Sequence, residues 1–487
     1  MNLELFIPEL SLVAFAIAVI LLDLFIQRKG LLVAVSLAGL VVSAGFTIAM
    51  WGGSSQAIFN NMLAVDNFAL FFKLLFLGIA ALVILASVDY VSRFARFQGE
   101  YHALVLLSTL GMMLMAATAD LISIYIALEL TSICLYILVG FLKDPKSSEA
   151  SLKYLLLGAI ASAVLLYGMA LVFGFTGKTQ LGEIAQVIQA MSPQTILASP
   201  ALILGIVLLV AGFGFKIAAV PFHMWVPDVY EGAPTPITAY LSVASKAAGF
   251  AIILRVFYSA FGSPELLNQV NWGIIFAVLS AIGMTLGNVV AIPQTNIKRM
   301  LGYSSIAQAG YLMVGLATMG LSPATDILGR SGLLFFLASY ALTNLGAFIA
   351  IIAISNKLDS DLIDDYSGMG KRAPLLALGL TLCFISLIGL PPAAGFMAKF
   401  YIFSGAIQHG LLWLVIIAVI NSVISAYYYL RVVKVMWLGE PVSEEKVPSS
   451  GALRVALSLS CLGVLLLGVI PGFVMKLAEL AASMLVF

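Results

Sequence analysis

Residues 212–240 read GFGFKIAAVPFHMWVPDVYEGAPTPITAY, an apolar stretch that holds a lysine and is then interrupted by prolines. Proline removes a backbone hydrogen-bond donor and breaks or kinks a helix. At membrane depth, broken helices are tolerated where the irregular backbone is buried in protein or lines a polar cavity. Pro221 and Pro227 therefore predict a transmembrane helix with a break, and Lys216 and His223 indicate what the cavity at that break would contain.

The composition of the whole chain is that of a membrane protein. Of 487 residues, 62% are hydrophobic and only 10% are charged, whereas soluble domains have about 25% charged residues. We therefore expect an all-α polytopic membrane protein. The net charge of +1 and the absence of an aromatic-studded basic patch argue against a nucleic-acid partner. The three cysteines are too dispersed in the sequence for a CxxC metal or redox motif.

A transmembrane helix needs about 20 mostly apolar residues, and that length gives about fourteen spans in this chain. The last span is predicted to extend to residue 486 or to stop at Pro471, which would leave an interfacial tail. No loop is long enough to form a soluble domain. The approximate limits are 4–26, 31–51, 64–88, 101–118, 121–142, 150–175, 201–226, 237–260, 272–293, 300–320, 331–355, 373–406, 411–438 and 452–486.

The distribution of Lys and Arg predicts the orientation, because cytoplasmic loops carry an excess of basic residues. If the N-terminus lies outside, the cytoplasmic side holds fifteen of the 24 basic residues and the other side holds three. The first segment has Glu4 and Glu9 before its apolar run and Arg28 and Lys29 after it, the reverse of a cleavable signal peptide with a basic start. We expect a retained first helix in a cell inner (plasma) membrane, and a thylakoid or other membrane is also compatible.

Six basic residues remain inside the predicted spans: Lys73, Lys153, Lys216, Lys246, Arg255 and Lys399. Each charge at a helix centre costs about 2.5 to 3.5 kcal/mol on insertion scales, so such residues are functional candidates by default. Lys216, Lys246 and Lys399 lie near mid-span with apolar residues on both sides. Because burial disfavours the ammonium form, a lysine in such a place can load and release a proton near neutral pH.

The other three basic residues have simpler interpretations than a role in proton transfer. Arg255 lies near a span end, where its long side chain can reach the membrane surface. Lys73 could instead stabilise a pair of helices. Lys153 is one turn into its span, within reach of the cytoplasmic interface.

Glu129, in LISIYIALELTSICLYILVGF, is the acidic counterpart of the lysines. A Glu/Lys pair at membrane depth can be tuned, since separating the partners changes the protonation of both; the alternative is a static buried ion pair. His223 suits a proton relay, although a histidine near a span end is often only a hydrogen-bonded core residue. No group of residues has metal-ligand spacing or a nucleotide-binding motif.

A second interruption lies in the twelfth span, where residues 387–400 read LIGLPPAAGFMAKF. Paired interruptions in two halves of a transporter mark its ion site. The offset of five spans from the seventh to the twelfth is an odd number, which implies repeats of inverted topology. The match is imperfect, because Lys216 precedes Pro221 whereas Lys399 follows Pro391 and Pro392.

Three stretches carry a resemblance to a known family. Residues 212–250 (GFGFKIAAVPFHMWVPDVYEGAPTPITAYLSVASKAAGF), 294–315 (QTNIKRMLGYSSIAQAGYLMVG) and 389–403 (GLPPAAGFMAKFYIF) resemble the antiporter-like subunits of proton-translocating NADH:quinone oxidoreductase, respiratory complex I. The QTNIKR and GYSSI segments resemble subunit N more than the related L and M subunits. The resemblance extends in order over essentially the whole chain.

The resemblance implies a fold and a set of functional residues. It implies three helices in 1–98, inverted five-helix repeats in 99–262 and 263–440, and a last helix in 441–487. The family's residues for proton translocation match Glu129, Lys153, Lys216, His223, Lys246 and Lys399.

The implied function is proton translocation from the cytoplasmic side to the outside, driven by quinone reduction elsewhere in the complex. No cofactor is expected in this chain; NAD, FMN, iron-sulfur clusters and quinone are implied in other subunits. The implied partners are other membrane subunits of complex I, both antiporter-like and small ones, and the lipid bilayer. Three alternatives remain: a subunit of a cation/proton antiporter or membrane-bound hydrogenase, a structural spacer, and a membrane-embedded transferase.

Overall fold

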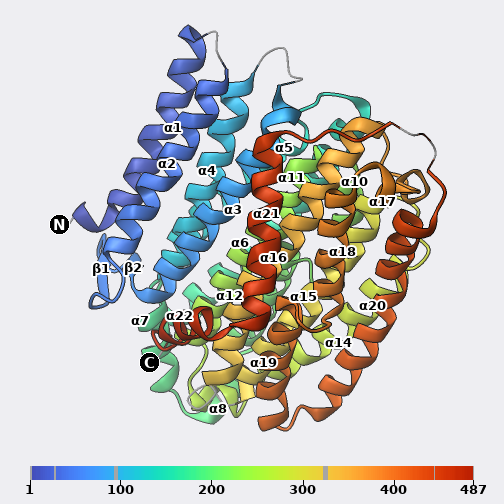
Figure 1. The fold of residues 1–487 in the computed structure, drawn as a ribbon. Coiled ribbons are helices and arrows are strands. Elements are labelled where there is room, and N and C mark those ends of the chain that lie inside the picture. The colour runs from blue at the N-terminus through green and yellow to red at the C-terminus, as the bar shows by residue number, and fades with distance from the viewer. Residues whose placement is uncertain are drawn as a thin grey trace.

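The computed structural model describes residues 3–26, 29–92, 97–321, 327–441, 443 and 445–485. Long helices stand side by side across the molecule, with α1 and α2 at one edge and α14 and α20 at the other (Figure 1). The only strands in the described ranges form a short antiparallel hairpin, β1 (Gln56–Ile58) and β2 (Leu63–Val65). The prediction of an all-α polytopic protein is confirmed.

Twelve helical segments in the described part of the chain are long and apolar enough to cross a membrane. Two more elements complete the predicted fourteen: α15 (Ile297–Leu321) and the interrupted pair α18 (Pro374–Ile388) and α19 (Ala394–Gln408). The twelve segments comprise η1 (Leu3–Phe6) with α1 (Ile7–Phe25), α2 (Gly30–Ala49), α3 (Asn67–Val91), α4 (Gln98–Ala117), α5 (Leu121–Val139), α6 (Pro145–Thr176), α9 (Pro200–Ile217), α11 (Thr235–Tyr240) with η2 (Leu241–Ser245) and α12 (Lys246–Ser259), α14 (Trp272–Ala291), α16 (Ile327–Leu358), α20 (Leu412–Leu438) and α21 (Gly451–Val469).

Local sequence signals set several helix starts. Asp66, Asp120 and Asp144 are the N-caps of α3, α5 and α6, and each carboxylate accepts hydrogen bonds from backbone N–H groups of the first turn. The predicted loop 177–200 contains two short helices, α7 (Leu181–Gln189) and α8 (Pro193–Leu197). The other short helices are α10 (Val226–Gly232), α13 (Pro264–Leu267), η3 (Ile363–Tyr366) and α17 (Met369–Arg372).

Both predicted helix breaks are present. Helix α9 ends at Ile217, Ala218 adopts a left-handed conformation with φ 61°, and α10 begins only at Val226. Pro221 lies inside this break, but Pro227 does not, because it occupies the first turn of α10. Residues 218–226 are therefore not part of the seventh spanning helix. Helix α18 ends before Gly389, whose φ of 93° favours glycine, and α19 starts after the two prolines.

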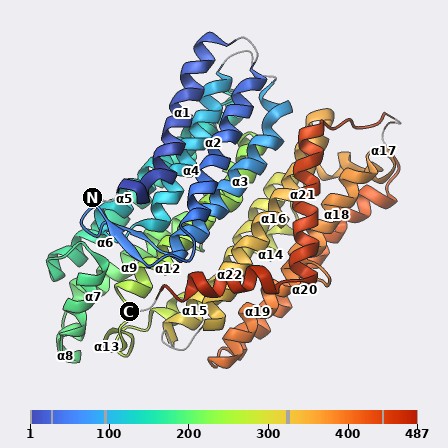
Figure 2. The same ribbon diagram turned by 60° about the vertical axis from the view of Figure 1, so that its left-hand side comes forward.

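The C-terminal part divides at Pro471, one of the two predicted outcomes. Helix α21 ends at Val469, and α22 (Gly472–Ala482) follows it. Figure 2 shows α22 lying across the ends of the long helices rather than parallel to them. The apolar face of α22 packs on α3 and α16.

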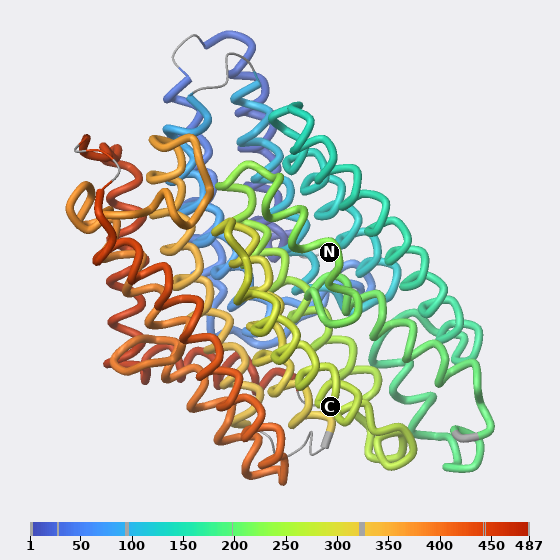
Figure 3. Tube along the Cα trace, turned by 90° about the vertical axis from the view of Figure 1, so that its right-hand side faces the viewer, coloured from blue at the N-terminus to red at the C-terminus, as the bar shows by residue number. Residues whose placement is uncertain are grey.

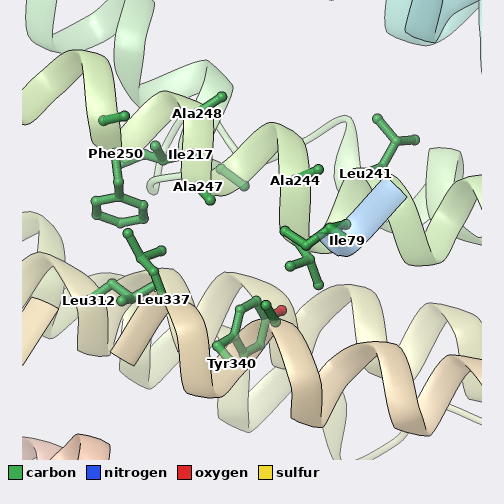
Figure 4. Packing of buried hydrophobic residues seen from close by; sticks show 14 of the residues in the cluster. Ile79, Ile217, Leu241, Ala244, Ala247, Ala248, Phe250, Leu312, Leu337 and Tyr340 are labelled. Atoms are coloured by element: carbon green, nitrogen blue, oxygen red, sulfur yellow. The ribbon is translucent and has the colours of Figure 1, made fainter. Parts of the chain in front are cut away.

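The centre of the molecule is formed by α11–η2–α12, α15 and α16, which are buried along almost their entire length. In Figure 4, Phe250 of α12 and Leu337 of α16 point toward one another, with Leu312 of α15 beside them. Figure 3 shows the segment around residues 145–176 at one edge and the α20 segment at the opposite edge. The buried helices therefore lie between these two outer layers.

Two buried ion pairs hold the N-terminal helices: one joins α1 to α3, and the other joins the start of α3 to α12. Lys73 of α3 lies 2.6 Å from Glu9 of α1, and both side chains are 1% exposed. The guanidinium of Arg255 on α12 binds Asp66 through two hydrogen bonds of 2.6 and 3.0 Å. The expectation that Arg255 extends to the membrane surface is therefore wrong, because a buried carboxylate is available to it. Arg28, Arg93 and Arg96, which contribute to the predicted charge bias, lie outside the described residues.

We expect Arg255→Met to destabilise the chain by about 3 to 5 kcal/mol, since it leaves the Asp66 carboxylate buried without its partner. The double variant Arg255→Met with Asp66→Asn should recover most of this loss. The measurement is the apparent unfolding temperature of the detergent-solubilised protein by circular dichroism. A double variant no more stable than Arg255→Met would contradict the assignment.

The Arg255–Asp66 pair makes the stability of the chain depend on pH. Burial raises the pKa of Asp66, but the charge and hydrogen bonds of Arg255 outweigh it and hold the pKa below its ordinary value. This stabilisation is present above the ordinary carboxyl pKa and is lost as the pH falls through the lowered pKa. The double variant Arg255→Met with Asp66→Asn has no carboxylate at position 66, so its stability should not fall in this way at acid pH.

Candidate functional site

Lys216 lies in the last turn of α9, directly before the break, and not at mid-span as its sequence context suggested. The backbone carbonyls at a helix C-terminus have no partner within the helix and carry partial negative charge, which favours a cation there. One of them, Phe215 O, accepts a hydrogen bond of 3.0 Å from Trp225 Nε1 across the break. Thus the end of α9 is fixed by the break that follows it.

The Lys216 ammonium is held by a hydroxyl group, not by a carboxylate. Its Nζ donates to Ser132 Oγ of α5 at 3.0 Å, while the Glu129 carboxylate, one turn away on α5, accepts a hydrogen bond from Ser162 of α6. No ion pair between Glu129 and Lys216 occurs among the described residues, in contrast to the expected direct pair. Lys216, Ser132 and Ser162 line a cavity of about 10 Å³, close to the lower limit for one water molecule.

Lys246 begins α12 immediately after the π-helical turn η2. Its Nζ donates to the backbone carbonyl of Ser305 on α15 and, at 2.5 Å, to the Ser305 hydroxyl. Two tyrosine hydroxyls reach the same hydroxyl, Tyr230 at 3.2 Å and Tyr340 at 3.1 Å. Single π-turns inside α-helices are frequent at functional sites.

Lys399 of α19 reaches back across the second break to the end of α18. Its Nζ donates to the carbonyls of Leu387 at 3.2 Å and Ile388 at 2.8 Å and to Ser422 Oγ at 2.9 Å, and it lies 4.3 Å from the ring centre of Tyr311. The C-terminal end of α18 therefore holds this ammonium, whereas the Lys216 ammonium, which comes from the last turn of α9, donates to Ser132 of α5. The two lysines occupy comparable places although their positions relative to the prolines differ.

Helix α15 connects the second and third lysines. Ser305, Gln308 and Tyr311 lie three residues apart on one face of α15, since residues at i and i+3 are neighbours on a helix. Gln308 Nε2 donates to Leu387 O at 3.1 Å, the same carbonyl that accepts from Lys399. A line of polar groups thus leads from Lys246 to Lys399.

Helix α9 approaches α12 closely at Gly249. A Cβ atom at Gly249, three residues after Lys246 on α12, would lie only 3.3 Å from Lys216 Cγ. The stem of Lys216 therefore packs directly on α12. Without a side chain at position 249, α9 can approach α12 this closely.

Lys153 belongs to a separate charge cluster at the basic ends of the helices. Its Nζ lies 2.7 Å from Glu149 and 2.9 Å from Asp228, and Arg299 also binds Asp228 at 2.7 Å. A cavity of about 1100 Å³ lies beside this cluster, lined by Glu149, Arg299 and residues of the Asn296–Lys298 and Asp359–Leu362 segments. The Lys153 side chain is 42% exposed, so the residue lies at the edge of the protein.

His223 lies inside the first break and is half-buried. Its Nδ1 is buried and has no hydrogen-bond partner among the described residues. No hydrogen bond or ion pair within these ranges joins it to Lys216 or Lys246. The structure therefore brings four candidates into two buried groups, Glu129 with Lys216 and Lys246 with Lys399 through α15, and leaves His223 in the break that follows Lys216.

Several polar residues of the site were missed from sequence. Ser132, Ser305 and Gln308 look like ordinary small or polar residues within helices, and only their contacts reveal them. Asp228 could have been found, because it is an acidic residue in the opening stretch, directly after Pro227. No group of three or more potential metal ligands occurs within the described residues.

Comparisons with known proteins give relatives whose names agree with one another. A sequence profile described as "NADH:quinone oxidoreductase/Mrp antiporter, TM" matches residues 118–425. The NADH-quinone oxidoreductase subunit N of Dehalococcoides mccartyi is 52% identical over 99% of this chain and all of that protein. The subunit N of Trichlorobacter lovleyi is 45% identical over 99% of this chain and 98% of its own length.

Solved structures agree with the fold. A chain of respiratory complex I from Thermus thermophilus is 33% identical with a TM-score of 0.81, covering 97% of this chain and 99% of its own. A chain of the Mrp complex from Dietzia sp. DQ12-45-1b has a TM-score of 0.86 at 21% identity, covering 100% and 98%, which establishes likeness of fold alone.

We expect Asp228→Asn to loosen α10, because Lys153 and Arg299 lose their shared carboxylate. Since Asp228 and its partners are each about a third exposed, solvent screens the pairs and the effect should be about 1 kcal/mol. Amide hydrogen exchange in Val226–Gly232 should become about five times faster. Glu149→Gln is the matched control, because Glu149 is 66% exposed, and equal effects of the two variants would refute the assignment.

The pH dependence follows from the same carboxylate. Burial raises the pKa of Asp228, but the hydrogen bonds from Lys153 and Arg299 outweigh it and hold the pKa below its ordinary value. Amide hydrogen exchange in Val226–Gly232 of the wild type should therefore stay slower than in Asp228→Asn as the pH falls through the ordinary carboxyl range. It should approach the exchange of Asp228→Asn only below the lowered pKa.

Proposed function

The chain belongs to the NADH:quinone oxidoreductase/Mrp antiporter family of membrane proteins, and we propose that it is the proton-translocating N-type subunit of an NADH:quinone oxidoreductase, respiratory complex I. The support is the full-length identity of 52% and 45% to relatives named subunit N. The chain is then one part of a translocase enzyme rather than an enzyme by itself.

One observation carries the role of the lysines. The structural cations Lys73 and Arg255 are paired with buried carboxylates. Lys216, Lys246 and Lys399 instead donate only to hydroxyl and carbonyl oxygens among the described residues. A neutral acceptor stabilises an ammonium less than a carboxylate does, so the buried lysine can become neutral without leaving an unpaired anion behind.

We infer a route along the buried axis. A proton from the cytoplasmic side resides on Lys216 or Lys246, passes the Ser305 hydroxyl and the Gln308 amide with the help of water, and reaches Lys399 before it leaves to the outside. Glu129 controls this step electrostatically, because its carboxylate favours the ammonium form of Lys216 when it approaches and releases the proton when it withdraws. His223 and Lys153 serve as relays toward the cytoplasmic side.

The wider setting follows from the same proposal. Quinone reduction in neighbouring subunits supplies the driving force, and NAD, FMN, iron-sulfur clusters and quinone belong to those subunits. The partners are other membrane subunits of the complex, antiporter-like and small ones. We place the chain in an energy-transducing cell membrane with its N-terminus outside, and divide it into 1–98, two inverted repeats at 99–262 and 263–440, and 441–487.

The alternative of a cation/proton antiporter or hydrogenase subunit has weaker support. The Mrp chain shares the fold but only 21% of the residues, whereas the relatives above 40% identity are oxidoreductase subunits. Lysine-rich rather than carboxylate-rich groups along the axis also favour protons over Na⁺.

Substitution of Lys246 by arginine separates proton release from static charge. Arginine keeps the positive charge but does not deprotonate in proteins. Lys246→Arg should therefore allow assembly of the complex while lowering proton pumping and quinone-coupled turnover at least about tenfold, since proton-transfer groups typically contribute about 10²- to 10⁴-fold. Pumping is measured in proteoliposomes, with the exposed Lys178→Arg as control. Normal pumping by Lys246→Arg would refute the proposed release.

A second pair of substitutions tests the spacer alternative. Lys216→Ala in the assembled complex should lower pumping and turnover together, again at least about tenfold. Lys216→Ala combined with Glu129→Gln should remain impaired. If the double variant assembles and pumps normally, the buried charges are structural.

A further inference from the structure

A second cavity, away from the lysine axis, lies between the start of α18 and the start of α21. Its volume is about 620 Å³, and four basic residues line it: Lys357, Arg372, Lys446 and Arg454. Among the described residues, Glu445 is the one acidic residue in its lining, and it pairs with Lys357 at 3.1 Å. The cavity therefore carries an excess of positive charge at the end of the helices that is rich in Lys and Arg.

Arg372 is built into the wall of this cavity. Its side chain is 6% exposed, and its Nε donates to the Glu445 carbonyl at 3.0 Å. Among the described residues, no partner is recorded for its two terminal guanidinium nitrogens, so they are available to a ligand. A planar guanidinium of this kind suits the paired oxygens of a phosphate group.

The helix ends add to the positive potential. Helix α18 starts at Pro374 with no side-chain cap, so the N–H groups of its first turn lack side-chain acceptors. Helix α21 starts at Gly451, next to the cavity residue Ser449. The positive ends of both helix dipoles therefore lie beside the basic residues, an arrangement that favours an anion.

The rest of the lining is apolar and continues along the helices. Leu376 and Val447 form part of the cavity wall. From the same helix ends, apolar side chains point outward along the two helices: Leu375 and Leu378 on α18, and Val455 and Leu459 on α21, each at least 50% exposed. A ligand that combines an anionic head with hydrocarbon tails matches both parts of this surface.

We propose that this cavity binds the phosphate headgroup of an anionic phospholipid, with the acyl chains lying along α18 and α21. Basic pockets between transmembrane helices on the cytoplasmic side are known to suit such headgroups. A free phosphate would leave the exposed leucines unused, and a zwitterionic headgroup would not satisfy the excess of positive charge. The proposal does not depend on proton movement through the lysine axis.

The test uses the assembled complex in nanodiscs with photoreactive phosphatidylglycerol. Labelling should map to peptides 372–378 and 445–459, and excess unlabelled phosphatidylglycerol should lower it at least tenfold. Photoreactive phosphatidylcholine should label these peptides at least fivefold less. Competition by millimolar inorganic phosphate should have no effect, whereas abolition of labelling by phosphate alone would assign the cavity to a free anion and overturn the lipid proposal.

Charge reversal provides the matched comparison. Lys446→Glu with Arg454→Glu should lower the labelling at least fivefold, while Lys434→Glu, an exposed lysine on α20 outside the cavity lining, should leave it unchanged. If the double variant does not assemble, the competition by unlabelled phosphatidylglycerol and by inorganic phosphate in the wild-type complex still tests the lipid proposal. Equal labelling by both lipids, equal labelling of both variants, or a neighbouring subunit cross-linked at these peptides in place of lipid would overturn the proposal.

Discussion

The meeting of the Lys399 ammonium with the carbonyl end of the interrupted helix α18 is the interaction on which the second half of this structure depends. A continuous transmembrane helix satisfies its backbone internally and offers no acceptor to a buried cation. Ending α9 and α18 within the span frees carbonyl groups and adds the negative end of a helix dipole. Lys216 belongs to one such end, and Lys399 donates to the other.

This arrangement explains why one chain handles buried charge in two ways. Where the helices must be held together, Lys73 and Arg255 have carboxylate partners, and removing one partner of such a pair is costly. At Lys216, Lys246 and Lys399, which we propose to release protons, the acceptors are hydroxyl and carbonyl groups that carry no charge of their own. In this proposal the choice of partner, rather than burial, separates the structural cations from those that release a proton.

Sequence alone predicted the number of spans, both breaks and the lysines, because apolar length, proline and isolated charge are local signals. It did not reveal that Arg255 meets Asp66, since these residues are 189 positions apart and only the packing of α12 on α3 joins them. It placed Lys216 too far from the helix end, because residues 218–226 are as apolar as the helix they follow. Ser132, Ser305 and Gln308 could not be recognised, since a buried hydroxyl or amide has no signature until its acceptor is known.

The π-turn Leu241–Ser245 has a consequence for everything that follows it on α12. One additional residue in a helical turn rotates the subsequent side chains by roughly 100° around the axis. Lys246, facing Ser305, and Arg255, facing Asp66, both lie after this turn. The angular setting of the whole helix, and with it the alignment of both Lys246 and Arg255 with their partners, thus depends on one additional residue in this turn.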